Sequence, residues 1–285
     1  MKIKENKHID KLIDTLRMGG RSKNTISNYV HAIHRFLEYF EDKDVSTLDE
    51  ADILEYIRKN YFDKNCAGNT YNMNISAIKY FYAVNFNKEF NNKLLPHAKL
   101  TKKIPATLDK EIFARILEEE PNLKRKCWLL LAYCSGLRSE EIATIKMENI
   151  HSKEHKLKVL GKRKKERFTV LTDLTIKYLR MYYRSNWRIF NKTDGYLFEG
   201  CANREYMSDK AVSNYFATIK KKYSLDENIS FHSLRHSFAT NFIKEGGDHF
   251  VLKSMLGHAS LSTTSIYVHM GRDFNNLKGV NYEQI

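Results

Sequence analysis

Hydrophobic side chains recur every three or four positions through the first part of the chain, which is the spacing of one face of an α-helix. The longest run begins after Ser22, a residue type that favours the N-cap position of a helix. Its apolar positions are Ile26, Tyr29, Val30, Ile33, Phe36, Leu37 and Phe40. A shorter run from Ile9 to Leu16 precedes it, and further runs begin at Ile53 and Ile75. The pattern therefore predicts four helices with short connections, which would form a small bundle.

The helical pattern lapses between Asn91 and Pro105, where the chain becomes basic. Two of the three prolines lie in this segment, and proline interrupts both helices and strands, so we expect a domain boundary here. The prediction is an N-terminal domain over residues 1–95, a linker over residues 96–106 and a C-terminal domain over residues 107–285.

Beyond this boundary the pattern is again mainly helical, with one exception. Two short, β-prone runs at residues 156–160 and 168–171 flank the polar turn 161–167 and predict a β-hairpin. The predicted helices lie at about 109–118, 122–135, from Ser139 onward, and at about 174–190, 209–222, 232–244, 248–256 and 262–268. The expected fold class is therefore mainly α with a small β-hairpin or sheet.

The charge of the chain favours a polyanionic partner. Its 48 lysines and arginines exceed its 34 acidic residues, which gives a formal net charge of +14 over 285 residues. The excess is uneven, because residues 1–100 carry 16 basic and 13 acidic side chains, whereas the remaining residues carry 32 and 21. We therefore expect nucleic acid as a partner, with most of the positive potential on the second domain.

The cysteines and the hydropathy pattern bear on the compartment. Cys66, Cys127, Cys134 and Cys201 form no C-x-x-C pair and indicate no disulfide framework. Cys127 and Cys134 lie on an apolar stretch, so we expect both to be buried. No signal peptide is visible, and no apolar run approaches the roughly 18 residues of a membrane span. We expect an intracellular protein without a membrane partner, cytoplasmic and associated with the nucleoid.

Three segments carry residues suited to attack on a DNA phosphodiester. They are Gly136-Leu-Arg138-Ser-Glu-Glu141, His232-Ser-Leu-Arg235-His236 and the run from His258 to Tyr267. Planar guanidinium groups can clamp the non-bridging oxygens of a phosphate, and histidine can donate or accept a proton near neutral pH. A tyrosine hydroxyl can act as the nucleophile. Together these residue types point to strand cleavage without a metal ion.

Each of these residues also has an ordinary structural explanation. Arg138 could cap a helix or face solvent, and Tyr267 is one of 17 tyrosines and could be a core residue. Lys162 lies in a basic turn that could simply be solvated or touch the DNA backbone. His232 and His236, four apart on a helix, could ligate zinc, but no glutamate lies between them and no third ligand is indicated. We therefore expect no metal and no cofactor.

In order and spacing, the chemistry-bearing residues closely resemble those of the tyrosine recombinase (phage integrase) family. They are Arg138, Lys162, His232, Arg235, His258 and Tyr267. The segment from Ser22 to Tyr29 resembles the opening of the family's core-binding domain, and residues 106–285 resemble its catalytic domain. The resemblance implies an N-terminal four-helix, SAM-like core-binding domain for DNA, followed by a tyrosine recombinase catalytic domain.

The resemblance also implies how the phosphate and the nucleophile are handled. Arg138 and Arg235 would clamp the phosphate, and His258 would be a further donor facing it. Tyr267 would be the nucleophile and would become joined to the 3′-phosphate. His232 would assist proton transfer from the attacking phenol.

Two further roles follow from the resemblance. Glu141 would hydrogen-bond and orient part of the site, and Lys162 would be the general acid that protonates the departing 5′-oxygen. The family's hairpin usually contains Gly-Lys-Gly, whereas this chain has Gly161-Lys162-Arg163. Loss of the second glycine limits left-handed backbone conformations in the turn, so Lys164 remains an alternative for the acid.

Small polar and basic residues near two helix starts of the bundle are candidates for DNA contacts. They are Arg21, Lys23, Asn24, Thr25, Asn69, Thr70, Asn74 and Lys79. The hairpin turn adds Arg163, Lys164 and Lys165. The resemblance implies that the bundle helices enter the major groove of double-stranded DNA opposite the catalytic domain. Helix caps and solvated faces explain each of these residues equally well when it is taken singly.

The resemblance further implies an assembly. A dimer would bind each of two DNA sites, and the resulting tetramer would exchange strands through a Holliday junction, with an accessory protein as an optional partner. The apolar tail positions Phe274, Leu277 and Val280 would dock either into a neighbouring subunit or onto their own chain.

Two other functional classes remain open at this point. One is a type IB topoisomerase acting as a monomer, and the small bundle and the absence of large insertions argue against it. The other is a catalytically inactive DNA-binding architectural protein, and the intact set of site residues argues against that.

Overall fold

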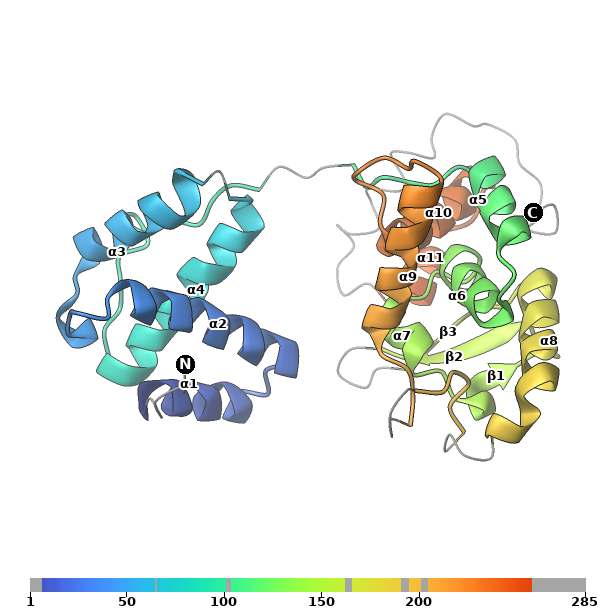
Figure 1. Cartoon of the computed structure of the whole chain (residues 1–285), viewed down its shortest axis with the longest axis horizontal. Helices are drawn as coiled ribbons and strands as arrows, with labels where there is room; N and C mark the ends of the chain where they lie inside the picture. Colours follow the sequence, from blue (N-terminus) through green and yellow to red (C-terminus); the bar gives the residue numbers. More distant parts are fainter. Residues whose placement is uncertain are drawn as a thin grey trace. The chain divides into compact units, whose positions relative to one another are not determined.

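Two compact units make up the chain, residues 1–103 and residues 104–285 (Figure 1). The computed structural model describes residues 7–64, 66–100, 104–161, 166–190, 195–200 and 205–257. Both units are mainly helical, and a small sheet lies in the second. Within the described ranges, no helix is at once long and apolar enough to cross a membrane.

The first unit is the four-helix bundle that the hydrophobic spacing predicts. Its helices are α1 (Lys7–Met18), α2 (Lys23–Tyr39), α3 (Glu50–Ile57) and α4 (Gly68–Phe86), and a π-helical turn (Arg58–Phe62) follows α3. The predicted N-cap of α2 is confirmed, because the hydroxyl of Ser22 accepts a hydrogen bond from the backbone N–H of Thr25. Helix α4 packs against both α1 and α2 and so closes the bundle.

Aromatic rings fill the core of this bundle. Phe36 of α2 is fully buried and meets Tyr56 edge to face, with ring centroids 5.1 Å apart. It meets Tyr82 of α4 in the same way at 6.1 Å. The hydroxyl of Tyr82 donates to the carbonyl of Val45, so the polar end of this buried ring is satisfied. One aromatic cluster thus joins α2, α3 and α4.

The segment that follows the bundle is fixed to α4. The side chain of Asn72 exchanges two hydrogen bonds with the backbone of Ala98, at 2.7 and 3.1 Å. The hydroxyl of Tyr71 donates to the carbonyl of Pro96 at 2.6 Å. The first residues of the predicted linker are therefore held on the first unit.

The second unit combines helices with a small antiparallel sheet. Its helices are α5 (Lys110–Glu119), α6 (Leu123–Tyr133), α7 (Ser139–Ala143), α8 (Asp173–Phe190), α9 (Asp209–Lys222), α10 (Phe231–Lys244) and α11 (His249–Leu256). Its strands are β1 (Ile150–His151), β2 (Lys156–Leu160) and β3 (Glu166–Val170), paired in that order. The sequence pattern does not predict β1, and β3 begins two residues before the expected strand. The helix expected at 262–268 lies outside the described residues.

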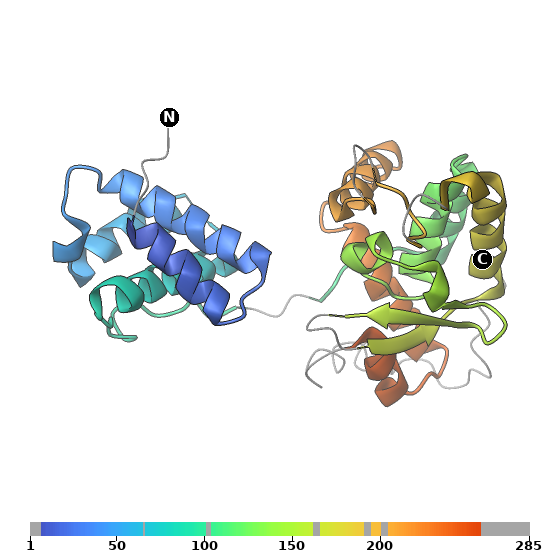
Figure 2. The same ribbon diagram turned by 90° about the horizontal axis from the view of Figure 1, so that it is seen from below.

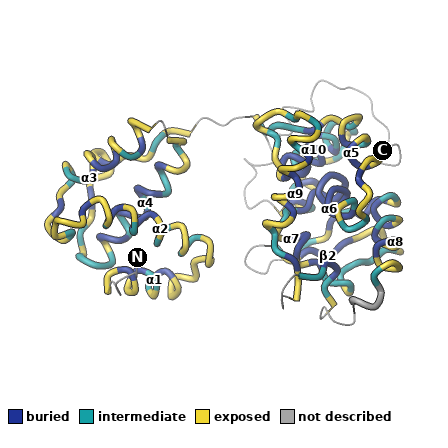
Figure 3. Tube along the Cα trace, in the orientation of Figure 1, coloured by how far each residue is buried: buried dark blue, intermediate teal, exposed yellow. Residues whose placement is uncertain are grey.

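Helix α6 forms the centre of this unit (Figure 3). From Cys127 to Cys134 every side chain is buried, and α8 and α10 both pack against the helix. A helical stretch that is apolar all round, as α6 is from Cys127 onward, belongs in an interior rather than at a surface. Burial raises the pKa of both cysteine thiols to about 12, and the prediction that they are core residues is confirmed.

The turn after α6 leads the chain into α7 and depends on Gly136. This residue has a φ of +67°, in the left-handed region that favours glycine. A Cβ here would lie 2.5 Å from a ring carbon of Phe238 on α10 and 2.9 Å from a methyl carbon of Leu256 on α11. Helix α11 itself packs against α10 and β3 (Figure 2). The glycine thus allows two helices to approach the start of α7.

We expect Gly136→Ala to lower the free energy of unfolding by roughly 2–5 kcal/mol, because left-handed strain and overpacking add. Gly195→Ala is the matched control, since Gly195 has a φ of +77° and nothing lies within 4 Å of its Cβ position. The control should lose only about 1–2 kcal/mol, from strain alone. Chemical denaturation of the two variants measures the difference, and equal losses would contradict the importance of the close approach to Phe238.

Candidate active site

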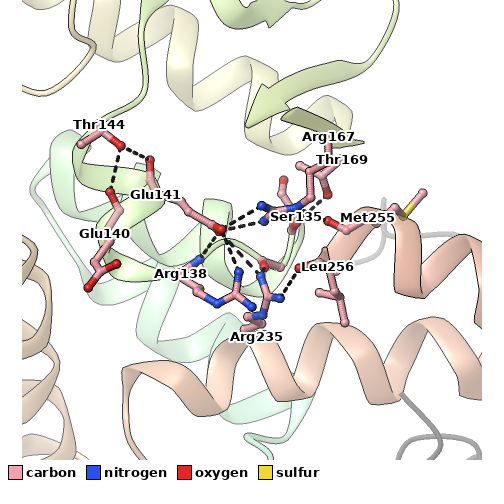
Figure 4. Close-up of polar contacts among 11 residues, drawn as sticks. Ser135, Arg138, Glu140, Glu141, Thr144, Arg167, Thr169, Arg235, Met255 and Leu256 are labelled. Atoms are coloured by element: carbon pink, nitrogen blue, oxygen red, sulfur yellow. Dashed lines mark hydrogen bonds and ion pairs between the residues drawn. The ribbon is translucent and has the colours of Figure 1, made fainter. Parts of the chain in front are cut away.

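A single buried carboxylate organises the polar side chains around the start of α7 (Figure 4). Glu141 lies in the first turn of this helix and accepts a hydrogen bond from the backbone N–H of Arg138 at 2.9 Å. Its other oxygen accepts one from the guanidinium group of Arg138, also at 2.9 Å. Glu141 is therefore bound to both the backbone and the side chain of Arg138.

A second arginine reaches the same carboxylate from the sheet. Arg167 of β3 places Nη1 and Nη2 each 2.8 Å from an oxygen of Glu141, which makes a bidentate pair. Its Nε donates to the carbonyl of Met255 near the end of α11, at 2.6 Å. Only 9% of the Arg167 side chain and 6% of the Glu141 side chain are exposed. This ion pair is therefore almost fully withdrawn from water.

The third arginine comes from α10 and lies deepest. The side chain of Arg235 is 2% exposed, and its Nη1 lies 3.7 Å from Glu141. Its guanidinium group donates to the carbonyl oxygens of Gly136 and Leu256. Arg235 therefore joins α10 to the turn before α7 and to the end of α11, as Figure 4 shows for the α11 contact.

Positive charges outnumber negative charges in this cluster. Burial by itself would raise the pKa of Glu141, but hydrogen bonds and attraction from Arg167, the backbone N–H of Arg138 and the charge of Arg235 outweigh it and lower the pKa. Glu141 is thus ionised at neutral pH and faces three guanidinium groups. The cluster keeps a net positive charge, which suits a phosphate group.

Two histidines lie beside the arginines on α10. The rings of His232 and His236 meet edge to face, with centroids 4.7 Å apart and an interplanar angle of 89°. His232 is exposed at the first turn of the helix, whereas His236 is partly buried one turn further on. A pocket of about 340 Å³ opens next to His232 and is lined by residues of α7, α9 and α10.

The structure brings together the predicted site residues that it describes. The side chains of Arg138, Glu141 and Arg235 form one cluster, and the charges of that cluster act on His232. Lys162, His258 and Tyr267, with the alternative acid Lys164, lie outside the described residues.

The predicted DNA contacts of the bundle divide into two groups. Exposed residues at the starts of α2 and α4 are Arg21, Lys23, Asn24, Asn69 and Thr70, and their contact with DNA stays a prediction. Thr25 is partly buried, and its hydroxyl and backbone N–H both lie within hydrogen-bonding distance of the Ser22 hydroxyl. The hairpin residues Arg163, Lys164 and Lys165 lie outside the described residues.

Asn74 and Lys79 form the second group, because their polar atoms are used inside the bundle. Asn74 is 1% exposed, donates to the carbonyl of Thr70 and accepts a hydrogen bond from Arg35. The ammonium group of Lys79 donates to the carbonyl of Leu95 at 2.7 Å, and burial lowers its pKa. The structure gives both residues hydrogen bonds within the first unit, and their contact with DNA stays a prediction.

Arg167 is the site residue that the sequence analysis does not identify. The basic run around Lys162 suggests a solvated turn, whereas the structure places Arg167 inside β3. Residues two apart on a strand share one face, and Arg167 shares its face with the buried Thr169. An arginine on the inward face of a strand needs a buried acid as its partner. The two-residue alternation along β3 is therefore the signal that could have identified Arg167 as a site residue.

Comparisons with known sequences point to one family. The profile described as "Phage integrase family" matches residues 106–272, and the profile described as "Phage integrase, N-terminal SAM-like domain" matches residues 9–91. Tyrosine recombinase XerA of Pyrococcus horikoshii is 32% identical over 256 residues, which cover 88% of this chain and 85% of the relative. Tyrosine recombinase XerD of Staphylococcus epidermidis is 27% identical over 266 residues, with coverage of 89% and 90%.

Solved structures share the fold. A lambda integrase dimer bound to a COC′ core site matches with a TM-score of 0.73 at 19% identity, covering 95% of this chain and 98% of that chain. The XerH recombinase bound to its difH substrate before cleavage matches with a TM-score of 0.71 at 19% identity, with coverage of 86% and 76%. At this level of identity the likeness shows the fold alone.

Both histidines of α10 favour the neutral form. His232 keeps more exposed surface than His236, but the groups packed around its ring still desolvate it and lower its pKa, Arg235 and Arg138 lower the pKa further, and Glu141 acts in the opposite direction. Desolvation, with repulsion from His232 and Arg235, lowers the pKa of His236 to about 4. Because an unfolded histidine titrates near 6.5, the unfolded chain binds a proton between about pH 4 and 6.5 that the folded chain does not.

We therefore expect His236 to make folding less favourable as the pH falls from about 6.5 towards 4, and to have no such effect above that window. One unit of pKa corresponds to about 1.4 kcal/mol, so the loss would be at most about 3.5 kcal/mol. His236→Asn cannot titrate and should show a flatter stability profile than the natural chain. Urea denaturation at several pH values measures both, and parallel profiles would contradict the shifted pKa.

Proposed function

The chain belongs to the phage integrase family of tyrosine recombinases, and on this premise we propose that it cuts and rejoins DNA at specific sites through a 3′-phosphotyrosyl intermediate. The observation that carries the proposal is the convergence of Arg138 and Arg235 on Glu141, beside His232. This arrangement supplies fixed positive charge at one place and a neutral imidazole next to it. Phosphoryl transfer to a tyrosine requires positive charge to stabilise the transition state and a base to accept the phenol proton.

In the proposed cleavage step, the hydroxyl oxygen of Tyr267 forms a bond to the phosphorus while the bond from phosphorus to the 5′-oxygen breaks. The pentacoordinate transition state carries extra negative charge on its non-bridging oxygens. Arg138 has a side chain that is 36% exposed and can meet this charge directly. Arg235 lies deeper, so we propose that DNA binding opens access to it.

Two proton transfers accompany this step. His232, with its lowered pKa, accepts the proton of the Tyr267 phenol, and Lys162 donates a proton to the departing 5′-oxygen. His258 donates a hydrogen bond to the phosphate. The charge-neutralising role falls to the guanidinium groups of the chain itself.

Rejoining is the reverse reaction with a different strand. The phosphotyrosyl bond conserves the energy of the cleaved phosphodiester, so a 5′-hydroxyl from a second duplex can attack it without ATP. We propose that residues 1–95 bind the duplex, that residues 107–285 carry the chemistry, and that a dimer on each site assembles into a tetramer. Strands would then be exchanged in pairs through a Holliday junction.

We expect Tyr267→Phe to abolish covalent attachment to DNA and to preserve DNA binding. The substitution removes the nucleophilic oxygen but leaves the ring and the basic surface in place. The assay is a nicked, end-labelled site, which traps the cleaved complex, resolved on a denaturing protein gel. A covalent band from the Phe variant would refute the assignment of the nucleophile.

The same assay separates the other functional classes. A chain that binds the site but never forms the covalent band would be an architectural binder. A chain that forms the band and relaxes supercoils, yet yields no recombinant joints between two differently labelled sites, would be a topoisomerase. Recombinant joints are the outcome that we expect.

We expect Lys162→Ala to slow cleavage of a normal substrate strongly and to slow a 5′-bridging phosphorothiolate substrate little. A sulfur leaving group needs no proton, so the phosphorothiolate substrate does not require the general acid. A positioned general acid typically contributes about 10²–10⁴-fold to the rate. Loss of an ordinary phosphate contact would weaken both substrates alike.

Lys164→Ala is the matched variant for this test, because it lies in the same turn. Thiolate rescue of the Lys164 variant and not of the Lys162 variant would move the acid to Lys164. The proposed residue would then be wrong, although general acid catalysis by the hairpin would stand.

A further inference from the structure

We propose that Arg167 is a positioning residue for strand cleavage: it neutralises Glu141, so that Arg138 and Arg235 present their charge to the phosphate. Arg167 itself would not touch DNA, because its side chain is 9% exposed and directed at Glu141 and Met255 (Figure 4). The inference rests on the proposed function of the cluster and adds to it a residue that acts through Glu141.

The geometry ranks the three arginines around the carboxylate. Arg167 makes two parallel hydrogen bonds of 2.8 Å, one to each oxygen of Glu141. Arg138 makes one side-chain bond of 2.9 Å, and Arg235 stands at 3.7 Å. A bidentate guanidinium–carboxylate pair is stronger and more directional than a single contact. Arg167 is therefore the principal counter-charge of Glu141.

Removing that counter-charge would alter the other two arginines. With all three present, the cluster holds three guanidinium groups against one carboxylate. Without Arg167, the buried carboxylate would depend on Arg138 and Arg235 alone and would bind Arg138 more tightly. The cluster would lose one of its two excess positive charges, just where a phosphate in transition gains negative charge.

Arg167 also ties together the segments that lead to the remaining site residues. Its own strand, β3, continues from the hairpin turn, and its Nε holds the carbonyl of Met255 at the end of α11. The chain turns there at Gly257, which has a φ of +63°. A Cβ on this glycine would lie 3.0 Å from Cδ of Arg167, so the end of α11 packs closely on the arginine. The buried side chain of Arg167 thus connects β3 to both α7 and α11.

The test compares Arg167→Met, Arg167→Lys and the double variant Arg167→Met/Glu141→Gln in the full chain. Methionine keeps an unbranched apolar stem and removes the charge, whereas lysine keeps the charge and loses the fork. Glutamine in the double variant removes the carboxylate that Arg167 neutralises. Lys158→Met is the matched control, because it removes the neighbouring ion pair between Lys158 and Glu166, at 2.9 Å, without touching the cluster.

The readout is the single-turnover rate of covalent complex formation on the nicked site at saturating protein, per folded molecule, below the melting temperature of every variant. We expect Arg167→Met to slow cleavage about 10²-fold, as misplaced charge groups do. DNA affinity should change less than about threefold, because phosphate contacts elsewhere dominate it. The double variant should recover at least about tenfold over Arg167→Met, because the unneutralised carboxylate is gone. The control should cleave like the natural chain.

Each other outcome overturns the inference. A double variant as slow as Arg167→Met would show that Arg167 does not act through the charge of Glu141. Unchanged cleavage per folded molecule would leave Arg167 a purely structural role. If Arg167→Met does not fold, Arg167→Lys decides, and a rate lower than the natural rate by more than about tenfold would contradict neutralisation by charge. Failure of the proposed function can be told apart from failure of this inference. In that case the natural chain would form no covalent complex with DNA, or the Tyr267→Phe variant would still form one.

Discussion

The buried carboxylate of Glu141 is the constraint on which the rest of the second unit depends. An ionised group that is 6% exposed is costly unless charges and hydrogen bonds surround it, so the fold has to bring cations to it. It does so from the turn before α7, through Arg138, and from two segments far away in the sequence, through Arg167 and Arg235. The same requirement that keeps Glu141 stable therefore assembles the site.

The backbone around the cluster is adapted to this assembly. Gly136 lets α10 and α11 close on the turn before α7, and its carbonyl accepts a hydrogen bond from Arg235. Gly257 lets the end of α11 pack on Arg167. Both glycines have left-handed φ angles, and at both a side chain would crowd a residue of the cluster or its supporting helices. Helix α6, apolar on every side from Cys127 onward, gives these elements a common core.

Sequence reasoning predicted those features that repeat with a regular period. The helices of the bundle and the buried run around Cys127 follow from apolar spacing, and the motif residues follow from their order. The two-residue strand β1 is too short to leave a pattern. Arg167 was not identified as a site residue, because it follows a run of basic residues that predicts a solvated turn rather than an inward-facing strand position. Asn74 was predicted to face DNA because the sequence alone does not distinguish an asparagine that is hydrogen-bonded inside a bundle from one that faces solvent.

Charge and proton affinity in this site are coupled through the same residues. Desolvation is the largest cause of the lowered pKa of His232, and the guanidinium groups of Arg235 and Arg138, which suit a phosphate, lower it further, so the ring favours the neutral form. A phosphate that neutralises those groups removes part of the cause of the shift, and its own negative charge acts in the opposite direction. If the phosphodiester binds as we propose, the affinity of the ring for a proton rises as it enters. In the cleavage step that we propose, His232 would therefore become a better proton acceptor when the phenol is ready to lose its proton.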